Sequence, residues 1–253
     1  GGGASRLMAA GRAGERGKRV LLLEKNKKVG EKLKISGGGR CNITNAEFDP
    51  RALLPAYGKA EQFLYSLFSQ FGVKETFSFF ESRGLPLIVQ DHKRAFPSTE
   101  KAEDVLKVLQ RYADDGGVII RTDSPVTRIH ASKGKITGVS SGKNIYSAVD
   151  YLFSTGGVSH PETGSTGDGF KWLKDLGHKV LPPTPAIVPL SVKEDWIKKL
   201  AGVSLSLMKI TFFVEGKKAF SESGKILFTH FGLSGPLILN IAHRVADLLH
   251  GGQ

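Results

Sequence analysis

Cysteine is nearly absent from this sequence of 253 residues, since Cys41 is the only one. A single cysteine excludes an intrachain disulfide and a cysteine-rich zinc site. Long apolar runs are also missing: the longest, such as 20–23 and 237–241, are broken within a few positions, whereas a membrane-spanning helix needs roughly 20 apolar residues. The start of the sequence has no pattern typical of a secretory leader. We therefore expect a protein of the reducing cytoplasm without a membrane partner.

Disorder is not expected, because 40% of the residues are hydrophobic and polar low-complexity tracts are absent. This composition predicts one large folded domain, or a domain and a half. The sequence begins at Gly1 rather than Met, and its first residues look like the middle of a motif. We therefore expect it to be a fragment of a longer protein.

Two residue classes are in excess. Lys and Arg outnumber Asp and Glu by 36 − 24 = +12, a balance that indicates an anionic partner such as nucleic acid. Glycine makes up 31 of the 253 residues and gathers at 1–3, 37–39, 156–157 and 164–169. Such clusters are typical of loops in which the backbone approaches a ligand closely.

The hydrophobic pattern predicts an α/β fold. We expect helices at 4–16, within 59–84, at 104–112, at 169–176 with Asp168 as N-cap, and at 236–249. We expect strands at 19–24, 85–90, 118–121, 126–130, 136–140, 151–154, 205–214 and 225–229. The strands between 118 and 140 suggest a small antiparallel meander. Residues 151–154 are expected to form a buried strand. Prolines between 182 and 189 mark a linker.

The first 24 residues have the order of a dinucleotide-binding unit: a glycine loop, a helix, a buried strand and the carboxylate of Glu24. In such units the helix N-terminus binds a pyrophosphate and the carboxylate accepts ribose hydroxyls. The other interpretation is a glycine-rich terminus beside an unrelated strand. Arg6 stands where the third glycine is expected, and Gly11 and Gly14 within the helix each cost roughly 1 kcal/mol relative to Ala.

Several longer strings carry a family resemblance: VLLLEKNKK (20–28), KLKISGGGRCNITN (32–45), TGGVSHPETGSTGDGF (155–170), PAIVPL (185–190) and FTHFGLSGP (228–236). Together they resemble a family of bacterial NAD(P)/FAD-dependent flavoproteins described as aminoacetone-oxidase-like or bile-acid-dehydroxylation-reductase-like. The resemblance implies a Rossmann-like FAD-binding domain over 1–188, with a parallel sheet and a small antiparallel meander. It also implies a partial β-barrel-like insert over 189–235 and the start of a helical insert over 236–253. The first strand and a C-terminal return segment of the FAD domain would lie outside the sequence.

The resemblance also implies a set of FAD-binding residues. The pyrophosphate would lie against Gly1, Gly3, Ala4 and Ser5, and the adenosine ribose against Glu24 and Lys25, with Lys32 nearby. A second loop along the cofactor would comprise Ser36, Gly37, Gly38, Gly39, Arg40, Cys41 and Asn42. Val126 would touch the adenine through its backbone, and Thr155, Gly156 and Gly157 would close over FAD. The sequence departs from the family at Arg6, at His160 in place of Tyr and at Glu162 in place of Lys.

Catalytic residues are not identified by the sequence. His160 and His230 fall in glycine-rich motifs and are candidates for a proton donor, although a hydrogen bond within a turn is the alternative for each. Ser165 and Thr166 are candidates for side chains that border the isoalloxazine or the substrate. Cys41 is either a redox thiol or, as we favour without a second cysteine, a small packing residue. The histidines show no metal-ligand spacing, so no metal is expected.

We therefore expect an FAD-dependent oxidoreductase acting on a small-molecule substrate. No second dinucleotide motif follows a strand, so electrons come either from the substrate or from NAD(P)H bound in another way. A flavin-binding protein or fragment without turnover is the alternative. A basic nucleic-acid-binding protein is a more distant one, because lysines other than those at 25–34 are scattered and no aromatic residues are interleaved with them.

Overall fold

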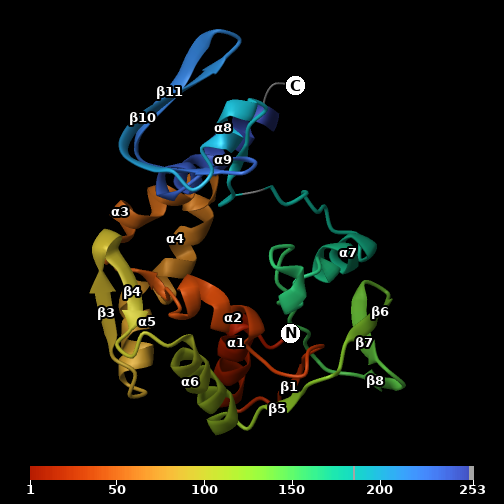
Figure 1. Ribbon diagram of the computed structural model, residues 1–253. Coiled ribbons are helices and arrows are strands. Elements are labelled where there is room, and N and C mark those ends of the chain that lie inside the picture. The colour runs from red at the N-terminus through yellow and green to blue at the C-terminus, as the bar shows by residue number, and fades with distance from the viewer. Residues whose placement is uncertain (185, 251–253) are drawn as a thin grey trace. The chain divides into compact units, whose positions relative to one another are not determined.

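The computed structural model describes residues 1–184 and 186–250, and the chain divides into two compact units, Gly1–Val180 and Leu181–Gln253 (Figure 1). The domain boundaries at 188 and 235 stay predictions. Within the second unit, α9 (Pro236–His250) packs against β11 (Lys217–Thr229). Each unit has its own hydrophobic core.

A parallel pair of strands forms the centre of the first unit. β1 (Leu21–Leu23) pairs with β5 (Ile119–Arg121), and Leu22 lies opposite Ile120. Helices α1 (Ala4–Glu15) and α6 (Ala102–Asp115) pack on each other beside this pair (Figure 1). Parallel strands connected through helices are the elementary unit of the Rossmann fold.

Close packing explains the two glycines within α1. A Cβ atom on Gly11 would overlap the ring of Tyr112 in α6, and one on Gly14 would overlap the carbonyl of Gly116. The helices approach each other so closely that side chains are excluded from both positions. The tight packing of α1 on α6 offsets the intrinsic helix cost of roughly 1 kcal/mol for each glycine.

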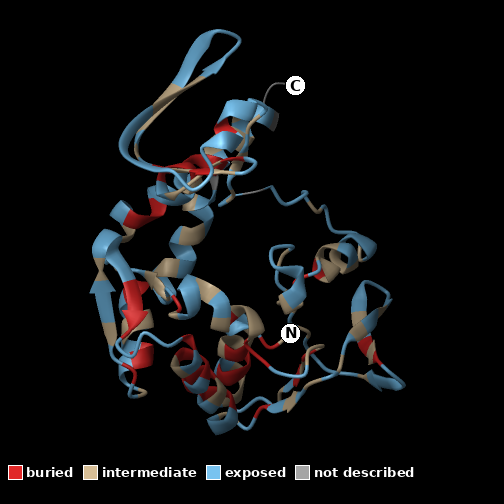
Figure 2. Cartoon of the chain, in the orientation of Figure 1, coloured by how far each residue is buried: buried red, intermediate tan, exposed pale blue. Residues whose placement is uncertain are grey.

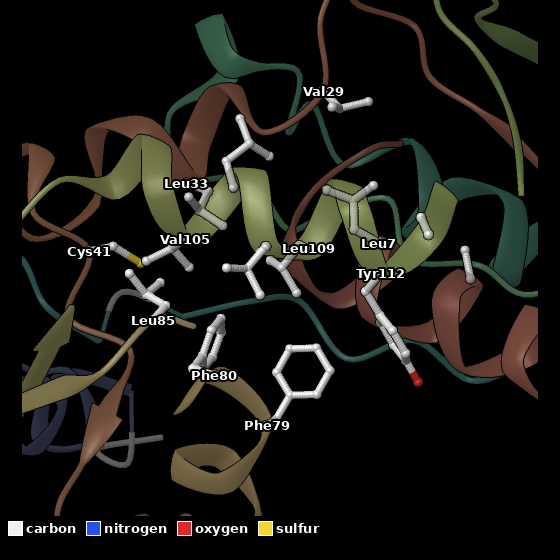
Figure 3. Close-up of a cluster of buried hydrophobic side chains, with 14 of the residues drawn as sticks. Leu7, Val29, Leu33, Cys41, Phe79, Phe80, Leu85, Val105, Leu109 and Tyr112 are labelled. Atoms are coloured by element: carbon white, nitrogen blue, oxygen red, sulfur yellow. The ribbon is translucent and has the colours of Figure 1, made fainter. Parts of the chain in front are cut away.

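The core of the first unit is formed mainly by α1, β1, α6 and α5 (Val73–Glu81) (Figures 2 and 3). Its buried members are Leu7, Ala10, Leu22, Val29, Leu33, Cys41, Phe79, Phe80, Leu85, Ala102, Val105, Leu106, Val108, Leu109, Tyr112, Ala113 and Val118. Each fully buried leucine or phenylalanine contributes roughly 1.5–3 kcal/mol of transfer free energy. This core fixes the position of α1 and β1, whose ends carry the candidate site.

The helical region predicted at 59–84 is two helices rather than one. α4 (Glu61–Gln70) ends before Gly72, and α5 (Val73–Glu81) begins after it. A Cβ on Gly72 would lie 2.7 Å from the Phe68 carbonyl oxygen, and the Gly72 N–H donates to Glu75 at 2.9 Å. Gly72 is thus the N-cap at which the apolar pattern is interrupted.

The strands between 118 and 146 do not all belong to one meander. β5 pairs with β1, whereas β6 (Val126–Ser132), β7 (Lys135–Ser141) and β8 (Asn144–Tyr146) form the antiparallel meander. The prediction placed 118–121 in the meander and missed β8. Short strands of this kind carry little information about their partners.

The buried strand predicted at 151–154 is wrong. These residues form no strand, and Leu152 is 65% exposed. They line a cleft instead. An apolar run beside an open cleft and an apolar run in a sheet have the same pattern in the sequence.

The remaining elements of the first unit are short. They are α2 (Glu31–Ile35), a 3₁₀ turn at Ser36–Gly39, β2 (Thr44–Asn45), α3 (Pro50–Leu53), 3₁₀ turns at Leu54–Ala60, Asp91–Lys93 and Pro161–Thr163, β3 (Leu87–Gln90), β4 (Arg94–Pro97) and α7 (Asp168–Asp175). Strands β2, β4 and β3 form a separate antiparallel sheet in that order.

The second unit is an antiparallel sheet with the order β10-β11-β12-β9, packed against two helices. Its elements are β9 (Leu190–Ser191), α8 (Asp195–Lys199), β10 (Ser204–Val214), β11 (Lys217–Thr229), β12 (Gly232–Ser234) and α9 (Pro236–His250). Ile226 and Phe228 of β11 pack with Ile238 and Ile241 of α9. The predicted strand at 225–229 is therefore the end of a longer strand, β11.

Membrane spans and metal clusters are both absent from residues 1–184 and 186–250. No helix in this part of the chain combines the length and the apolar character that a membrane span requires. In the same residues, His, Cys, Asp and Glu side chains form no group of three that could hold a metal ion.

Candidate cofactor-binding cleft

A cleft of about 1990 Å³ opens in the first unit. Its walls are the N-terminus of α1, the end of β1, and many but not all of the residues within 24–33 and 146–168. Pockets for small ligands usually measure roughly 300–1,000 Å³. The cleft is therefore large enough for an extended ligand such as a dinucleotide.

The first glycine loop presents unsatisfied backbone groups to this cleft. Gly3 is the N-cap of α1 and has no side-chain cap. The N–H groups of Gly3, Ala4 and Ser5 are exposed and have no acceptor among the residues that the structure describes. A helix N-terminus with free N–H groups and a partial positive charge favours an anion.

Gly2 fixes the position of this loop. Its carbonyl accepts from the Gly30 N–H at 2.8 Å, and its N–H donates to the Glu24 carboxylate. A Cβ on Gly2 would overlap the side chain of Val29. Glycine is required here by the close approach of two backbone segments.

Glu24 is a buried carboxylate at the C-terminal end of β1, with 5% of its surface exposed. Besides the Gly2 N–H, it accepts from the Asn26 N–H at 2.7 Å, and it lies 3.9 Å from the amino group of Gly1. A carboxylate has about four lone-pair sites, so acceptor capacity remains for further donors. That Glu24 binds the ribose stays a prediction, but its carboxylate does lie at the cleft.

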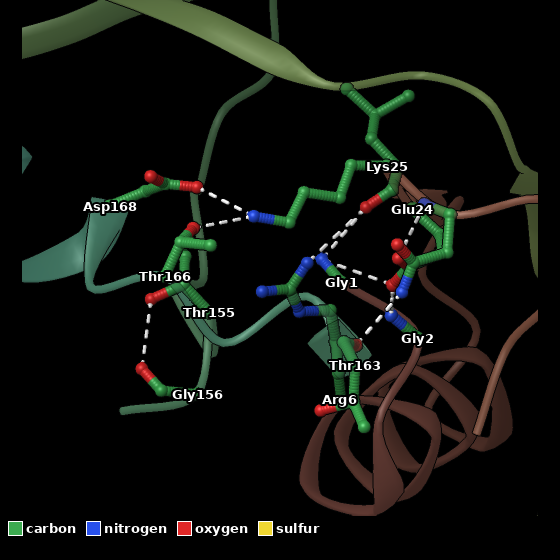
Figure 4. Close-up of polar contacts among 12 residues, drawn as sticks. Gly1, Gly2, Arg6, Glu24, Lys25, Thr155, Gly156, Thr163, Thr166 and Asp168 are labelled. Atoms are coloured by element: carbon green, nitrogen blue, oxygen red, sulfur yellow. Dashed lines mark hydrogen bonds and ion pairs between the residues drawn. The ribbon is translucent and has the colours of Figure 1, made fainter. Parts of the chain in front are cut away.

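Arg6 lies beside the first loop and across the end of β1 (Figure 4). Its Nη1 atom donates to the Leu23 carbonyl at 3.3 Å, whereas its Nε atom is buried without a hydrogen-bond partner in the described part of the chain. Burial lowers the pKa of Arg6, and the nearby Glu24 carboxylate acts in the opposite direction. The substitution of the third glycine thus places an incompletely satisfied cation at the wall of the cleft.

The second glycine loop contributes less to the cleft than predicted. Gly37, Gly38 and Gly39 have φ angles of 56°, 66° and 84°, in the left-handed region, and none of them lines the cleft. Ser36, Cys41 and Asn42 do line it.

Arg40 of this loop is turned toward another surface. Its guanidinium contacts Gln90 at 3.2 Å and Glu100 at 3.0 Å, and lies 4.4 Å from the ring centroid of Phe96. That Arg40 faces a cofactor diphosphate stays a prediction. A carboxylate and an aromatic face already satisfy its guanidinium.

Cys41 packs in the core next to this loop, with 7% of its surface exposed. Burial raises the pKa of the thiol, although a hydrogen bond involving Ser36 opposes this. A buried thiol with a raised pKa is mainly protonated and unreactive at neutral pH. This environment agrees with the packing role favoured from the sequence.

The predicted residues from the rest of the first unit also lie at the cleft: Lys25, Lys32, Val126, Thr155, Gly156, Gly157 and Ser165 line it. Asp168 lines it as well but is not the N-cap of α7, because Gly167 occupies that position and Asp168 is the first helical residue. Its carboxylate binds Lys25 at 3.0 Å instead. That hydrogen bond lowers the pKa of Asp168.

The two histidine candidates belong to different units of the chain. His160 does not line the cleft, and its Nδ1 lies 2.8 Å from Glu162 within the same turn. His230 belongs to the second unit, where its ring packs edge-on against Phe231. That either histidine donates a proton stays a prediction.

Sequence reasoning missed the apolar wall of the cleft and the role of Asn26. Leu21, Leu23, Val149 and Leu152 contribute to that wall. Asn26 donates to the Thr163 carbonyl at 2.9 Å across 137 positions of the sequence. The available signal was a polar residue shortly after a buried strand, but no local sequence pattern identifies the residue that it contacts.

Comparison with known proteins identifies the family. A family model described as the HI0933-like protein Rossmann domain matches residues 1–229. The chain belongs to this family. It comprises FAD-dependent Rossmann proteins, which confirms the predicted fold class and the resemblance to flavoproteins.

Two curated relatives are similar over nearly the whole chain. The 3-dehydro-bile acid delta(4,6)-reductase of Clostridium scindens is 29% identical, and the match covers 100% of this chain and 61% of the relative. The ribosomal RNA dihydrouridine synthase of Escherichia coli is 28% identical, and the match covers 96% of this chain and 59% of the relative. The chain thus spans about three-fifths of the length of these relatives.

A solved structure supports the fold. The open conformation of a flavocytochrome c3 fumarate reductase is similar with a TM-score of 0.60 at 17% identity. The match covers 81% of this chain and 46% of that chain. At this identity the likeness concerns the fold alone.

Proposed function

We propose that this protein is an FAD-dependent reductase of a carbon–carbon double bond. The observation that carries the proposal is the N-terminus of α1, whose free N–H groups at Gly3, Ala4 and Ser5 face a large cleft beside the Glu24 carboxylate. The free N–H groups fit the diphosphate of FAD, and the Glu24 carboxylate fits a ribose. Arg6 and the glycines of the second loop are the departures from that fit.

The reaction class is supported by the names of two relatives. One is called a delta(4,6)-reductase and the other a dihydrouridine synthase, and both names describe the saturation of a double bond. Such a reduction adds two electrons and two protons. The bound flavin would supply the hydride, with a proton from a side chain or solvent, and an external hydride donor of the NAD(P)H class would reduce the flavin again.

The protein's residues would bind and orient the cofactor rather than provide the redox chemistry. The α1 N-terminus stabilises negative charge, and the apolar wall that includes Leu21 and Leu152 restricts water. Ser165 and Thr166 remain candidates for substrate contacts, and His160 and His230 for proton transfer.

The substrate is either a small molecule, as expected from the sequence, or RNA. The net charge of +12 favours RNA, and one relative is named for ribosomal RNA. An RNA substrate predicts a KM that rises steeply with salt concentration, because released counterions contribute to binding. A small apolar substrate predicts little dependence on salt.

A combined flavin and substrate experiment tests the proposal. FAD is titrated into the 253-residue chain, the bound flavin is reduced anaerobically with NADPH or NADH, and reoxidation is followed after addition of a uridine-containing RNA or a conjugated steroid ketone. We expect FAD to bind and one of the substrates to reoxidise the flavin and gain two hydrogens. Absence of FAD binding would refute the proposal. FAD binding without reoxidation by either substrate would favour the alternative, a flavin-binding fragment without turnover.

A further inference from the structure

A group of long-range polar contacts connects the segment after β1 with residues 155–168, which we call the cover segment. Lys25 Nζ donates to Thr166 Oγ1 at 2.7 Å and to Asp168 Oδ2 at 3.0 Å (Figure 4). Lys32 Nζ donates to Ser165 Oγ at 2.6 Å and to the Ser159 carbonyl. Partners of these lysines are separated from them by 127 to 143 positions in the sequence.

The cover segment has little regular structure of its own. Its only helical parts are the 3₁₀ turn at Pro161–Thr163 and the first residue of α7 at Asp168. Gly156, Gly164 and Gly167 have positive φ angles of 78°, 101° and 81°, and the backbone hydrogen bond from Gly167 to Gly157 stays within the segment. The position of this segment over the cleft therefore depends strongly on side chains from outside it.

The two lysines contact the cover segment from the cleft wall. Lys25, Lys32, Ser165 and Asp168 all line the cleft, and Ser165 is 7% exposed. Thr166 and Asp168 accept from two of the three N–H donors of the Lys25 ammonium, and Asp168 also supplies the opposite charge. That Lys25 binds the adenosine ribose, as the family resemblance implies, stays a prediction.

We propose that Lys25 and Lys32 are positioning residues that fasten the cover segment across the cleft and thereby slow the release of FAD. This inference rests on the proposed function, because FAD is taken as the ligand. The contacts by which the lysines hold the segment do not depend on which ligand binds. Lys25 acts through Asp168 and Thr166, and Lys32 acts through Ser165 and the Ser159 carbonyl. Loss of either set of contacts weakens the attachment of the segment, which Asn26 also contacts at the Thr163 carbonyl.

A competing role for Lys25 is simple attraction of an anionic cofactor. The two roles predict opposite effects of Asp168→Asn. If Lys25 fastens the segment, removal of the Asp168 charge breaks the contact and FAD leaves faster. If Lys25 only attracts anions, removal of a neighbouring negative charge strengthens the attraction and FAD is held more tightly.

The experiment compares Lys25→Gln, Asp168→Asn and Lys32→Gln with the control Lys27→Gln. Lys27 is exposed, lies two residues from Lys25 and does not line the cleft, so the control removes the same charge without a contact to the segment. FAD release is followed by flavin fluorescence after dilution, and hydrogen exchange of the 155–168 amides is measured on the chain without FAD.

We expect Lys25→Gln and Asp168→Asn each to raise the release rate and the amide exchange of 155–168 by roughly three- to tenfold, the scale of an ion pair plus a hydrogen bond at a partly exposed site. Combined, the two substitutions add little to either alone. Lys25→Arg restores slow release, and Lys27→Gln changes neither readout.

The proposal is overturned if Asp168→Asn slows FAD release, or if Lys25→Gln and Lys27→Gln behave alike in both measurements. If the unsubstituted chain fails to bind FAD, the proposed function is wrong, whereas hydrogen exchange still decides whether the lysines fasten the segment. Equal exchange in all variants would then refute the fastening as well.

Discussion

The glycine-rich loops at residues 1–3 and 37–39 have similar composition but different tasks. In residues 1–3, glycine allows close approach: a Cβ on Gly2 would overlap Val29, and the N–H groups that follow face the cleft. In residues 37–39, glycine allows a left-handed backbone, with positive φ at each position. Only the first loop lines the cleft with its glycines.

This difference shows that a glycine cluster does not by itself indicate a phosphate site. The second loop turns the chain from α2 into β2, and its arginine binds Glu100 rather than pointing into the cleft. A helix N-terminus distinguishes the first loop, since α1 has twelve residues and an N-cap without a side chain. Substitutions in the two loops can therefore distinguish an effect on FAD affinity from an effect of backbone strain on stability.

Gly2→Ala is expected to have the largest effect. The added methyl group forces Val29 to move in a packed region, which costs roughly 1–3 kcal/mol of unfolding free energy, and displaces the loop that presents the free N–H groups. Urea unfolding measures the first effect and FAD titration the second. Partial recovery of stability in the double variant Gly2→Ala/Val29→Ala would identify the clash as the cause, and unchanged stability of Gly2→Ala would contradict it.

Gly3→Ala is expected to change FAD affinity more than it changes the free energy of unfolding. A Cβ at this position has no atom within 4 Å and Gly3 has an ordinary φ of −78°, so the loss of stability is limited to a poorer N-cap, roughly 0.5–1 kcal/mol. The methyl group projects beside the N–H groups that face the cleft, and we expect FAD affinity to fall about tenfold, or 1.4 kcal/mol. FAD affinity equal to that of the unsubstituted chain would argue against an anion site at α1.

Gly38→Ala provides the matching substitution in the second loop. Its Cβ would also meet no atom within 4 Å, but the φ of 66° is unfavourable for alanine, at a cost of roughly 1–2 kcal/mol. We expect a lower urea midpoint and unchanged FAD affinity after correction for the unfolded fraction. A tenfold loss of affinity would place the second loop at the diphosphate after all.

Ionisation of Cys41, which follows the second loop, is expected to have the smallest effect on stability. Because burial raises the pKa of its thiol in the folded state, the stability contributed by the neutral thiol is complete below the ordinary pKa of roughly 8.5 and is lost as the pH rises through the higher folded value. We expect slow alkylation by iodoacetamide at about pH 7 to 8.5 and rapid alkylation in urea. Rapid alkylation of the folded chain at neutral pH would indicate a reactive thiol instead.

The parts of the fold predicted from the sequence are those with local signals. The glycine loop, α1, β1 and Glu24 follow one another in the chain, and their order alone predicted the wall of the cleft. The contacts of Arg40 and Lys25 could not be predicted, because their partners, Glu100 and Asp168, lie 60 and 143 positions away. Residues 151–154 were predicted as a buried strand because periodicity does not distinguish a cleft wall from a sheet.

The most direct test of the central claim is a ¹H–¹⁵N NMR titration of the chain with FAD. We expect the amide signals of Gly3, Ala4 and Ser5 to shift strongly, whereas those of Gly37, Gly38 and Gly39 change little. Strong shifts confined to residues 37–39, with the α1 N-terminal amides unchanged, would contradict it.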